Sequence, residues 1–493
     1  MVGVPGRSKG CVTCRKRKKG CDLKQPECSQ CLERGTPCGG YDVDRVFVYL
    51  DGGARKRHNS HAATASIISR GPGTDAVERR ASPLLPLSIT LPASLCRSAY
   101  EERSLEAFIS FYLPQINPAA TNWDGKEIVG MVPALSTRDE ALRLALSAIG
   151  TVALSKQTQD PELLRHGRNL YGKALVETRR ALASPTRSRS TAVLAIPRIM
   201  ALFEILFGAD ANTGTQANSW LSHAEGEMAL IVARGPEAYN DDDAHSLFVN
   251  ARYRPLIASV RTRKRTVLNE ERWKTIPWLG RVKTPNDTLL DIMAAIPEIL
   301  ENVDRWGNLS SGSPEDEAKD LQTSARCWTL HFQLQDWLSA NEHEIHTPVT
   351  TTPTPITFPT FEIACLTVRY WVTSLLLYTA LDTASGVPPE NTSCTHPNRP
   401  HPRQFARFIL RATTYFFRTE FGATGATSIA FPLGNTMLYT QRNPKVDAPY
   451  IAIVIRAWND PNLPSAIKNF LNSLRLSVSP RSSPEPVGGL SRG

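Results

Sequence analysis

Apolar residues recur at helical spacing from about Ala99 to residue 476. After Thr137-Arg138-Asp139-Glu140, which resembles a capping box, they follow at steps of three and four: Leu142, Ala145, Leu146, Ile149 and Val152. Asp160-Pro161-Glu162 offers an N-cap and an N1 proline for another amphipathic helix, and Pro285-Asn286-Asp287 precedes a third run that extends to Val303. Clear alternating strands are lacking, so the pattern predicts an all-α domain over 99–476.

Further helices are predicted at six ranges: 192–208, 217–233, 318–340, 360–383, 401–418 and 447–475. The most apolar stretch, Ile363 to Leu381, is almost long enough to span a bilayer. Polar residues such as Thr367 and Thr373 dilute it, so we expect a buried core helix and no membrane partner. The Thr/Pro-rich run 347–355 is predicted to be a loop that separates two lobes.

Glycine, proline and serine interrupt the pattern at two places. Residues 39–98 contain Gly52-Gly53 and Gly71-Pro72-Gly73, which predict a flexible, disordered linker, and the tail 477–493 has the same character. The linker shows no heptad repeat. A homodimer therefore has no coiled coil to support it here.

Six of the ten cysteines lie near the N-terminus with metal-ligand spacing. They form two copies of a C-x2-C-x6-C unit: Cys11, Cys14, Cys21, Cys28, Cys31 and Cys38. Structural zinc takes four ligands in a tetrahedron. Six thiolates can serve two zinc ions only if two of them bridge, and the repeat suggests one bridge per half, with Cys11 and Cys28 as the natural candidates. A segment this small has almost no apolar core, so metal binding would supply its folding free energy.

A disulfide framework is the competing interpretation of six cysteines in a short segment. The stretch Met1 to Arg7 contains no apolar signal segment, so an oxidising compartment is not implied. The remaining four cysteines are scattered without a pairing pattern. We therefore expect zinc rather than disulfides.

Positive charge is concentrated in the cysteine module. Residues 1–60 carry 13 Lys and Arg against 6 Asp and Glu, a net charge of +7 in a chain whose total is +10. Five of these cations are consecutive between Cys14 and Cys21: Arg15, Lys16, Arg17, Lys18 and Lys19. The equivalent part of the second half reads Leu32-Glu33-Arg34-Gly35. If each C-x2-C pair opens a short helix, the first helix is the one that can contact phosphates and base edges.

Residues 11–38 resemble the fungal Zn(II)2Cys6 binuclear cluster family of transcription factors. The run from Cys14 to Asp22 matches the family's C-R-x-R-K-x-x-C-D core, and Pro26 matches a loop proline. The resemblance implies two zinc ions bridged by Cys11 and Cys28, a base contact from Lys18 with Arg17 beside it, and CGG-type DNA triplets. Gly20 departs from the pattern, since a basic or aliphatic residue is more usual there.

A second resemblance covers most of 99–476. The motif Trp220-x2-His223-x2-Gly226, followed by Leu230 and Arg234, is similar to the fungal-specific transcription factor regulatory domain. Trp220, His223, Glu227 and Ile231 share one helix face, where core packing is expected, and Gly226 would permit close approach of another helix. Together the two resemblances imply a small binuclear zinc-cysteine cluster module (11–38) and a large all-α regulatory domain (99–476), joined by a disordered linker.

The implied function is a nuclear, zinc-dependent, sequence-specific transcription factor for RNA polymerase II genes, a pathway-specific regulator of the kind that controls secondary-metabolite clusters. Its expected partners are double-stranded DNA and the transcription machinery. An enzyme is not expected, because His343-Glu344-Ile345-His346 lacks the spacing of a zinc protease and no phosphate or dinucleotide loop is present. The alternative is a zinc-knuckle-type binder of RNA or single-stranded DNA, although the module has no aromatic residue for stacking on bases.

Overall fold

The computed structural model divides the chain into two compact units, Met1–Ile89 and Thr90–Gly493. It describes residues 11–22, 24 and 28–38 of the first unit, and residues 93–113, 128, 130–208, 214–307, 314–386, 398–460, 463 and 465–476 of the second. Within these ranges the first unit is a cysteine module and the second is built of helices without a strand. The predicted fold class is confirmed. The predicted linker, apart from its last residues, and the tail 477–493 lie outside the described residues.

The first unit contains two short helices, α1 (Val12–Lys16) and α2 (Ser29–Leu32). Each begins directly after the first cysteine of a C-x2-C pair, as the sequence predicts. The buried side chains of this unit are cysteines: Cys11, Cys14, Cys28 and Cys31 are no more than 1% exposed. No aliphatic or aromatic core holds the described part together, so the thiols take the place of a core.

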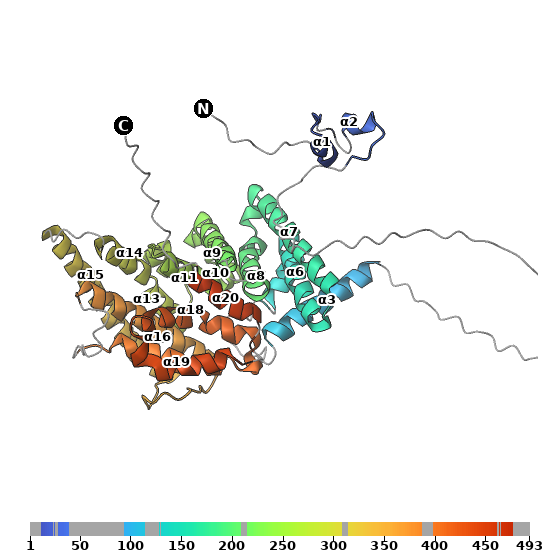
Figure 1. Ribbon diagram of the computed structural model, residues 1–493. Coiled ribbons are helices and arrows are strands. Elements are labelled where there is room, and N and C mark those ends of the chain that lie inside the picture. Colours follow the sequence, from blue (N-terminus) through green and yellow to red (C-terminus); the bar gives the residue numbers. More distant parts are fainter. Residues whose placement is uncertain are drawn as a thin grey trace, which may run out of the picture. The chain divides into compact units, whose positions relative to one another are not determined.

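The second unit is a layered assembly of helices (Figure 1). Its first part comprises α3 (Ala93–Tyr112), α5 (Met131–Ser136), α6 (Glu140–Thr158), α7 (Pro161–Ala183), α8 (Thr191–Phe207), α9 (Thr215–Arg234), α10 (Asp242–Ala251), α11 (Tyr253–Thr262) and α12 (Glu271–Thr275). Its second part comprises α13 (Pro285–Met293), α14 (Ile296–Gly307), α15 (Pro314–Ala340), α16 (Phe361–Ala384), α17 (Pro402–Phe416), α18 (Gly422–Thr440), α19 (Pro444–Trp458) and α20 (Ser465–Leu476). Helices α3, α6 and α7 lie side by side in Figure 1, and α8 packs against α9.

Side-chain caps start several of these helices. Asp160 accepts hydrogen bonds from the first turn of α7, with Pro161 at N1, as predicted. At α13 the capping box is formed by Thr284 and Asp287. The predicted start at Thr137 is wrong, because Asp139 is the N-cap of α6 and accepts from the backbone of Ala141 at 2.9 Å. Asp139 lies two residues after Thr137, directly before the first residue of α6, so its carboxylate reaches the unpaired N–H groups of the first turn.

Helix α16 lies in the middle of the second part, packed against α15, α17 and α18. By length and composition it could cross a membrane, but 78% of its most apolar stretch is buried inside the unit. This confirms the predicted core helix. The loop after α15 does not separate two lobes, since the backbone of Ile356 bonds to the carbonyl of Arg411, whose guanidinium in turn donates to the carbonyls of Thr350 and Thr354.

Two predicted helices are each split in the structure. The run 285–303 forms α13 and α14, because Pro297 stands at the start of a new helix and cannot continue the preceding one. The range 447–475 forms α19 and α20, and the sequence between them carries Pro461 and Pro464. Prolines mark both breaks, although hydrophobic spacing continues across them.

The Trp220 motif is a packing motif, with one correction. Trp220, Glu227 and Ile231 are buried on the inner face of α9, as expected. Gly226 is exposed, and a Cβ there would meet no atom within 4 Å. The predicted close approach of another helix at Gly226 is therefore wrong.

Candidate metal centre and nucleic-acid interface

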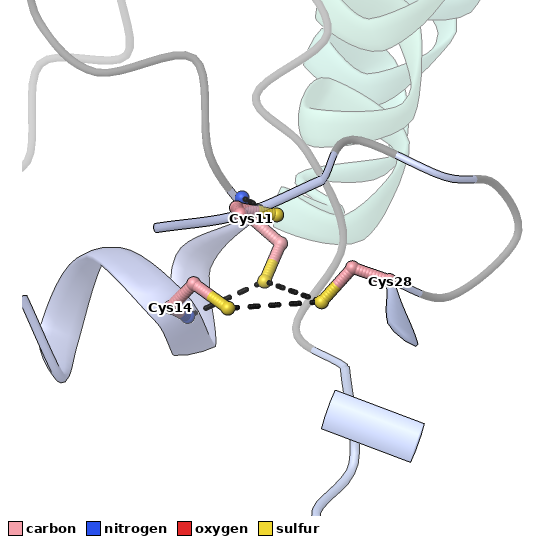
Figure 2. Close-up of side chains that lie close together, drawn as sticks. Cys11, Cys14 and Cys28 are labelled. Atoms are coloured by element: carbon pink, nitrogen blue, oxygen red, sulfur yellow. Dashed lines mark hydrogen bonds between the residues drawn. The ribbon is translucent and has the colours of Figure 1, made fainter. Parts of the chain in front are cut away.

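The cysteine thiols converge on one point in the first unit. The sulfur of Cys28 lies 3.7 Å from that of Cys11 and 3.7 Å from that of Cys14. Figure 2 shows these three side chains pointing toward one another. The sulfur of Cys31 lies 3.8 Å from that of Cys11. A tetrahedral zinc site with Zn–S bonds of about 2.3 Å has sulfur atoms about 3.8 Å apart. The spacing of the thiols is that of a zinc–thiolate site.

The six thiols form two overlapping groups of four. One group is Cys11, Cys14, Cys21 and Cys28, and the other is Cys11, Cys28, Cys31 and Cys38; within each group all sulfurs lie within 4.8 Å of one another. Each group offers the four ligands that one zinc requires. Cys11 and Cys28 belong to both groups, which is the arrangement that two metals bridged by two thiolates need.

Backbone N–H groups point at the sulfurs. The amide of Cys14 donates to the thiol of Cys11 at 3.3 Å, and the amide of Cys11 donates to that of Cys21 at 3.4 Å. Such hydrogen bonds stabilise thiolate charge around a metal. The local fold thus orients the ligands before any longer-range packing contributes.

Burial of the thiols opposes ionisation in the absence of metal. It raises the pKa of Cys14 to about 12, and it also raises the pKa of Cys28 and Cys31. Thiolates, however, are the species that bind zinc. Zinc binding therefore displaces protons, and zinc affinity rises with pH.

The two halves of the module end their helices in the same way. The amide of Lys19 bonds to the carbonyl of Cys14 at 3.1 Å, and the amide of Thr36 bonds to that of Cys31 at 3.1 Å. These are Schellman-type ends, which place one residue in the left-handed conformation. In the second half that residue is Gly35, with φ of 60°, whereas in the first half it is Lys18, with φ of 54°.

The basic run lies on α1 and the turn that follows it. Arg15 and Lys16 belong to α1, and Arg17 to Lys19 follow it. Lys16, Lys18 and Lys19 are exposed. Among the described residues, no carboxylate forms an ion pair with any of these three lysines. A cluster of exposed ammonium groups at one helix end is suited to contact a polyanion.

Two contacts that hold the halves together were not predicted from the sequence. The carboxylate of Asp22 accepts from the amide of Ser29 at 3.2 Å, at the start of α2. Hydrogen bonding with Ser29, first from its side chain and then from its backbone, lowers the pKa of Asp22. The hydroxyl of Thr13 donates to the carbonyl of Pro37 at 3.0 Å. No short sequence motif indicates either contact, because the two partners of each pair lie on opposite sides of the loop that joins the halves.

Comparisons with known proteins follow the same division. Residues 9–45 match the family model described as the fungal Zn(2)-Cys(6) binuclear cluster domain. Residues 103–415 match the model described as the fungal specific transcription factor domain. No solved structure matches the chain.

Three curated proteins are similar to parts of the chain. "Arginine metabolism regulation protein II" of Saccharomyces cerevisiae is 54% identical over 41 residues, which is 8% of this chain and 5% of that protein. "Aspercryptin biosynthesis cluster-specific transcription regulator atnN" of Emericella nidulans is 27% identical over 209 residues, 39% of this chain and 30% of that protein. An uncharacterized Emericella nidulans protein is 24% identical over 203 residues, 40% of this chain and 42% of its own length. The matches span less than half of each relative.

Proposed function

The chain belongs to the family of fungal transcription factors that combine a Zn(2)-Cys(6) cluster with a fungal-specific regulatory domain, and on this basis we propose that it is a nuclear, sequence-specific regulator of RNA polymerase II genes. The family consists of transcription regulators rather than enzymes, which confirms that no catalytic activity is to be expected. Zinc-cluster domains of this kind bind two zinc ions and DNA.

We assign the two zinc ions to the two groups of four thiols, with Cys11 and Cys28 bridging. Two dications and six thiolates carry a net charge of −2. The run from Arg15 to Lys19 lies beside these sulfurs in sequence and offsets that charge. The zinc ions would fix the distance between α1 and α2 and so hold the basic end of α1 in a defined orientation.

The observation that carries the DNA proposal is the contrast between the two helix ends. At the end of α1 the exposed side chains are those of Lys16, Lys18 and Lys19, whereas at the end of α2 Leu32, Glu33 and Arg34 are exposed. The first end therefore carries three exposed cations, whereas at the second end the charges of Glu33 and Arg34 cancel. We propose that this end contacts the major groove and that α2 faces away from it.

Within that interface the residues have different roles. Lys18 is our candidate for the base contact, because a lysine can donate to the O6 and N7 atoms of guanine in a CGG-type triplet. Contacts with DNA phosphates position the module without reading the base sequence. We assign these contacts to Arg15, Lys16, Arg17 and Lys19. Lys18 adopts a left-handed backbone conformation, which is less favourable for a lysine than for a glycine. The presence of lysine at this position supports a role for its side chain.

A pathway-specific role is the finer part of the proposal. Two of the similar proteins carry names that denote regulators of one pathway, arginine metabolism in one case and aspercryptin biosynthesis in the other. We infer the same type of restricted target set for this chain, and a secondary-metabolite cluster is the candidate. The helical unit would then connect the DNA-bound module with the transcription machinery.

The test compares nucleic acids on one full-length, zinc-loaded preparation. A CGG-containing duplex, a scrambled duplex of equal length, the CGG single strand and its RNA equivalent compete for the same labelled duplex. We expect the CGG duplex to compete best by at least about tenfold, the lower end of the discrimination that base contacts provide. Better competition by a single strand or by RNA would favour the zinc-knuckle alternative instead.

A further inference from the structure

A cavity of about 510 Å³ lies within the helical unit. Its lining residues come from α8, α9, α11, α14, α16, α18, α19 and α20, and from Tyr112 at the end of α3. Cavities of roughly 300–1,000 Å³ are the size that small-molecule ligands occupy in proteins. The first unit, with its cysteine module, is not needed to form the cavity.

Most of the wall is apolar and aromatic. Trp220 from α9 and Phe470 from α20 pack edge to face, with ring centroids 6.2 Å apart, and Leu202, Ile257 and Phe431 extend the surface on neighbouring helices. Such a wall favours a ligand with an aliphatic or aromatic body.

The charged part of the wall has one sign. Among the described residues that line the cavity are five arginines and no acidic side chain: Arg198, Arg254, Arg261, Arg263 and Arg369. Two of them are held by carboxylates outside the wall, Arg254 by Glu227 at 2.6 Å and Arg263 by Asp304 at 2.6 Å. Arg369 donates to the neutral amide oxygen of Asn286 and lies over the ring of Tyr253. Cations in an apolar wall favour an anionic ligand.

Several polar residues also line the cavity. Tyr112, at the end of α3, is one of them, together with Arg198, Arg254 and Thr424. Burial raises the pKa of Tyr112, and the charges of Arg198 and Arg254 act in the opposite direction. Thr424 at the start of α18 donates to the carbonyl of Tyr112 at 2.7 Å. Two arginines, a tyrosine and a threonine therefore contribute polar groups to the wall, whereas the aromatic and aliphatic residues contribute its apolar surface.

We propose that this cavity binds an amphipathic organic anion, with its carboxylate or sulfonate bound by Arg198 and Arg254 and its apolar body against Trp220, Phe431 and Phe470. Arg254 is suited to this role because Glu227 engages its Nε and Nη2 atoms and so fixes the orientation of the guanidinium. The site is independent of the DNA proposal, since the residues that form it belong to the helical unit alone.

Gly434 provides a direct way to block the cavity. It lies in α18 and lines the cavity, and a Cβ there would meet no atom within 4 Å. A Gly434→Leu side chain would therefore enter open space in the cavity without displacing the fold. Gly226→Leu in α9 is the matched control, because it is also a helical glycine with no atom near its Cβ but does not line the cavity.

The experiment titrates decanoate and decanol into the full-length, zinc-loaded chain by calorimetry. We expect one saturable site per chain for decanoate, with affinity at least about tenfold higher than for decanol, which corresponds to about 1.4 kcal/mol for the charged contact. Gly434→Leu should abolish this site and Gly226→Leu should retain it.

Leu438→Glu gives a second, independent variant. Leu438 lines the cavity and is 42% exposed, so the substitution is tolerated by the fold and places a negative charge at the cavity. It should weaken decanoate binding several-fold more than decanol binding. The proposal is overturned if no saturable decanoate site is found, if decanol binds as tightly as decanoate, or if folded Gly434→Leu binds decanoate like the wild type.

Discussion

Lys18 occupies a left-handed backbone conformation that its counterpart Gly35 adopts without strain, and this costs a lysine about 1 kcal/mol. We expect Lys18→Ala to reduce the preference for a CGG duplex over a scrambled one by about tenfold or more, because a base contact is lost. Lys16→Ala should weaken binding to both duplexes alike. It should also make the slope of log affinity against log salt concentration shallower by about one, which corresponds to one lost phosphate contact. Fluorescence anisotropy at several salt concentrations measures both effects.

Lys18→Gly separates the side chain from the backbone in this comparison. Glycine relieves the left-handed strain, so the variant should fold at least as stably and still lose the CGG preference. Equal loss of specific and random DNA affinity in Lys18→Ala would assign Lys18 to phosphate instead of base.

Cys28 is fully buried and belongs to both groups of four thiols. A bridging sulfur serves two metals, so Cys28→Ser should reduce the zinc content below two per chain and unfold the module. Atomic absorption on the purified full-length variant measures this directly.

The control for that variant is Cys365→Ser, which changes a half-buried thiol of the helical unit. It should keep two zinc ions per chain. Retention of two zinc ions by Cys28→Ser would instead show that the metals do not share this sulfur.

At the scale of elements, a partly buried chain of polar side chains joins α7, α8 and α9. Tyr171 donates to the carboxylate of Glu204 at 2.6 Å, and its oxygen lies 2.8 Å from Nε2 of His223. Since the phenol donates to Glu204, a neutral His223 with the proton on Nε2 can complete the chain. Burial lowers the pKa of His223 from 6.5 to about 4.

This arrangement predicts a loss of stability in acid. Between pH 6.5 and pH 4 the unfolded chain protonates His223 while the folded chain does not, so the free energy of unfolding decreases as the pH falls. The variant His223→Gln lacks this titrating group. Between pH 6.5 and pH 4 its free energy of unfolding should decrease by less than that of the wild type, with a difference of up to about 3 kcal/mol. Urea unfolding followed by circular dichroism measures the difference.

His343→Gln is the matched control, because His343 is exposed at 73% of its side-chain surface. Its unfolding free energy should follow the pH dependence of the wild type. If His223→Gln followed the same curve, the buried neutral state of His223 would be wrong.

Helix prediction from the sequence succeeded where apolar spacing and caps agreed and failed where backbone packing decides. Helix α7 followed from Asp160 and its periodic leucines. Helix α18 was not predicted, since it contains three glycines and Pro432. At one of those positions packing requires glycine, because a Cβ on Gly425 would lie 2.1 Å from the carbonyl oxygen of Phe416. Glycine there permits close contact with the end of α17, which no local pattern reveals.

For the whole molecule, the sequence alone identified the metal module but not the cavity. Local spacing of cysteines fixes which thiols can meet, because few residues separate the ligands of each group. The cavity instead depends on residues from α3 to α20, which are brought together only by the packing of the helical unit. Scattered arginines in a sequence give no indication that they line one wall.

The central claim is that two zinc ions on six cysteines position the end of α1 for duplex DNA. The measurement that tests it most directly is the competition between the CGG and scrambled duplexes, carried out with full-length chain of known zinc content and again after zinc removal. We predict two zinc ions per chain, a clear preference for the CGG duplex, and loss of that preference without zinc. Fewer than two zinc ions, or an equal affinity for both duplexes in the zinc-loaded chain, would contradict the account.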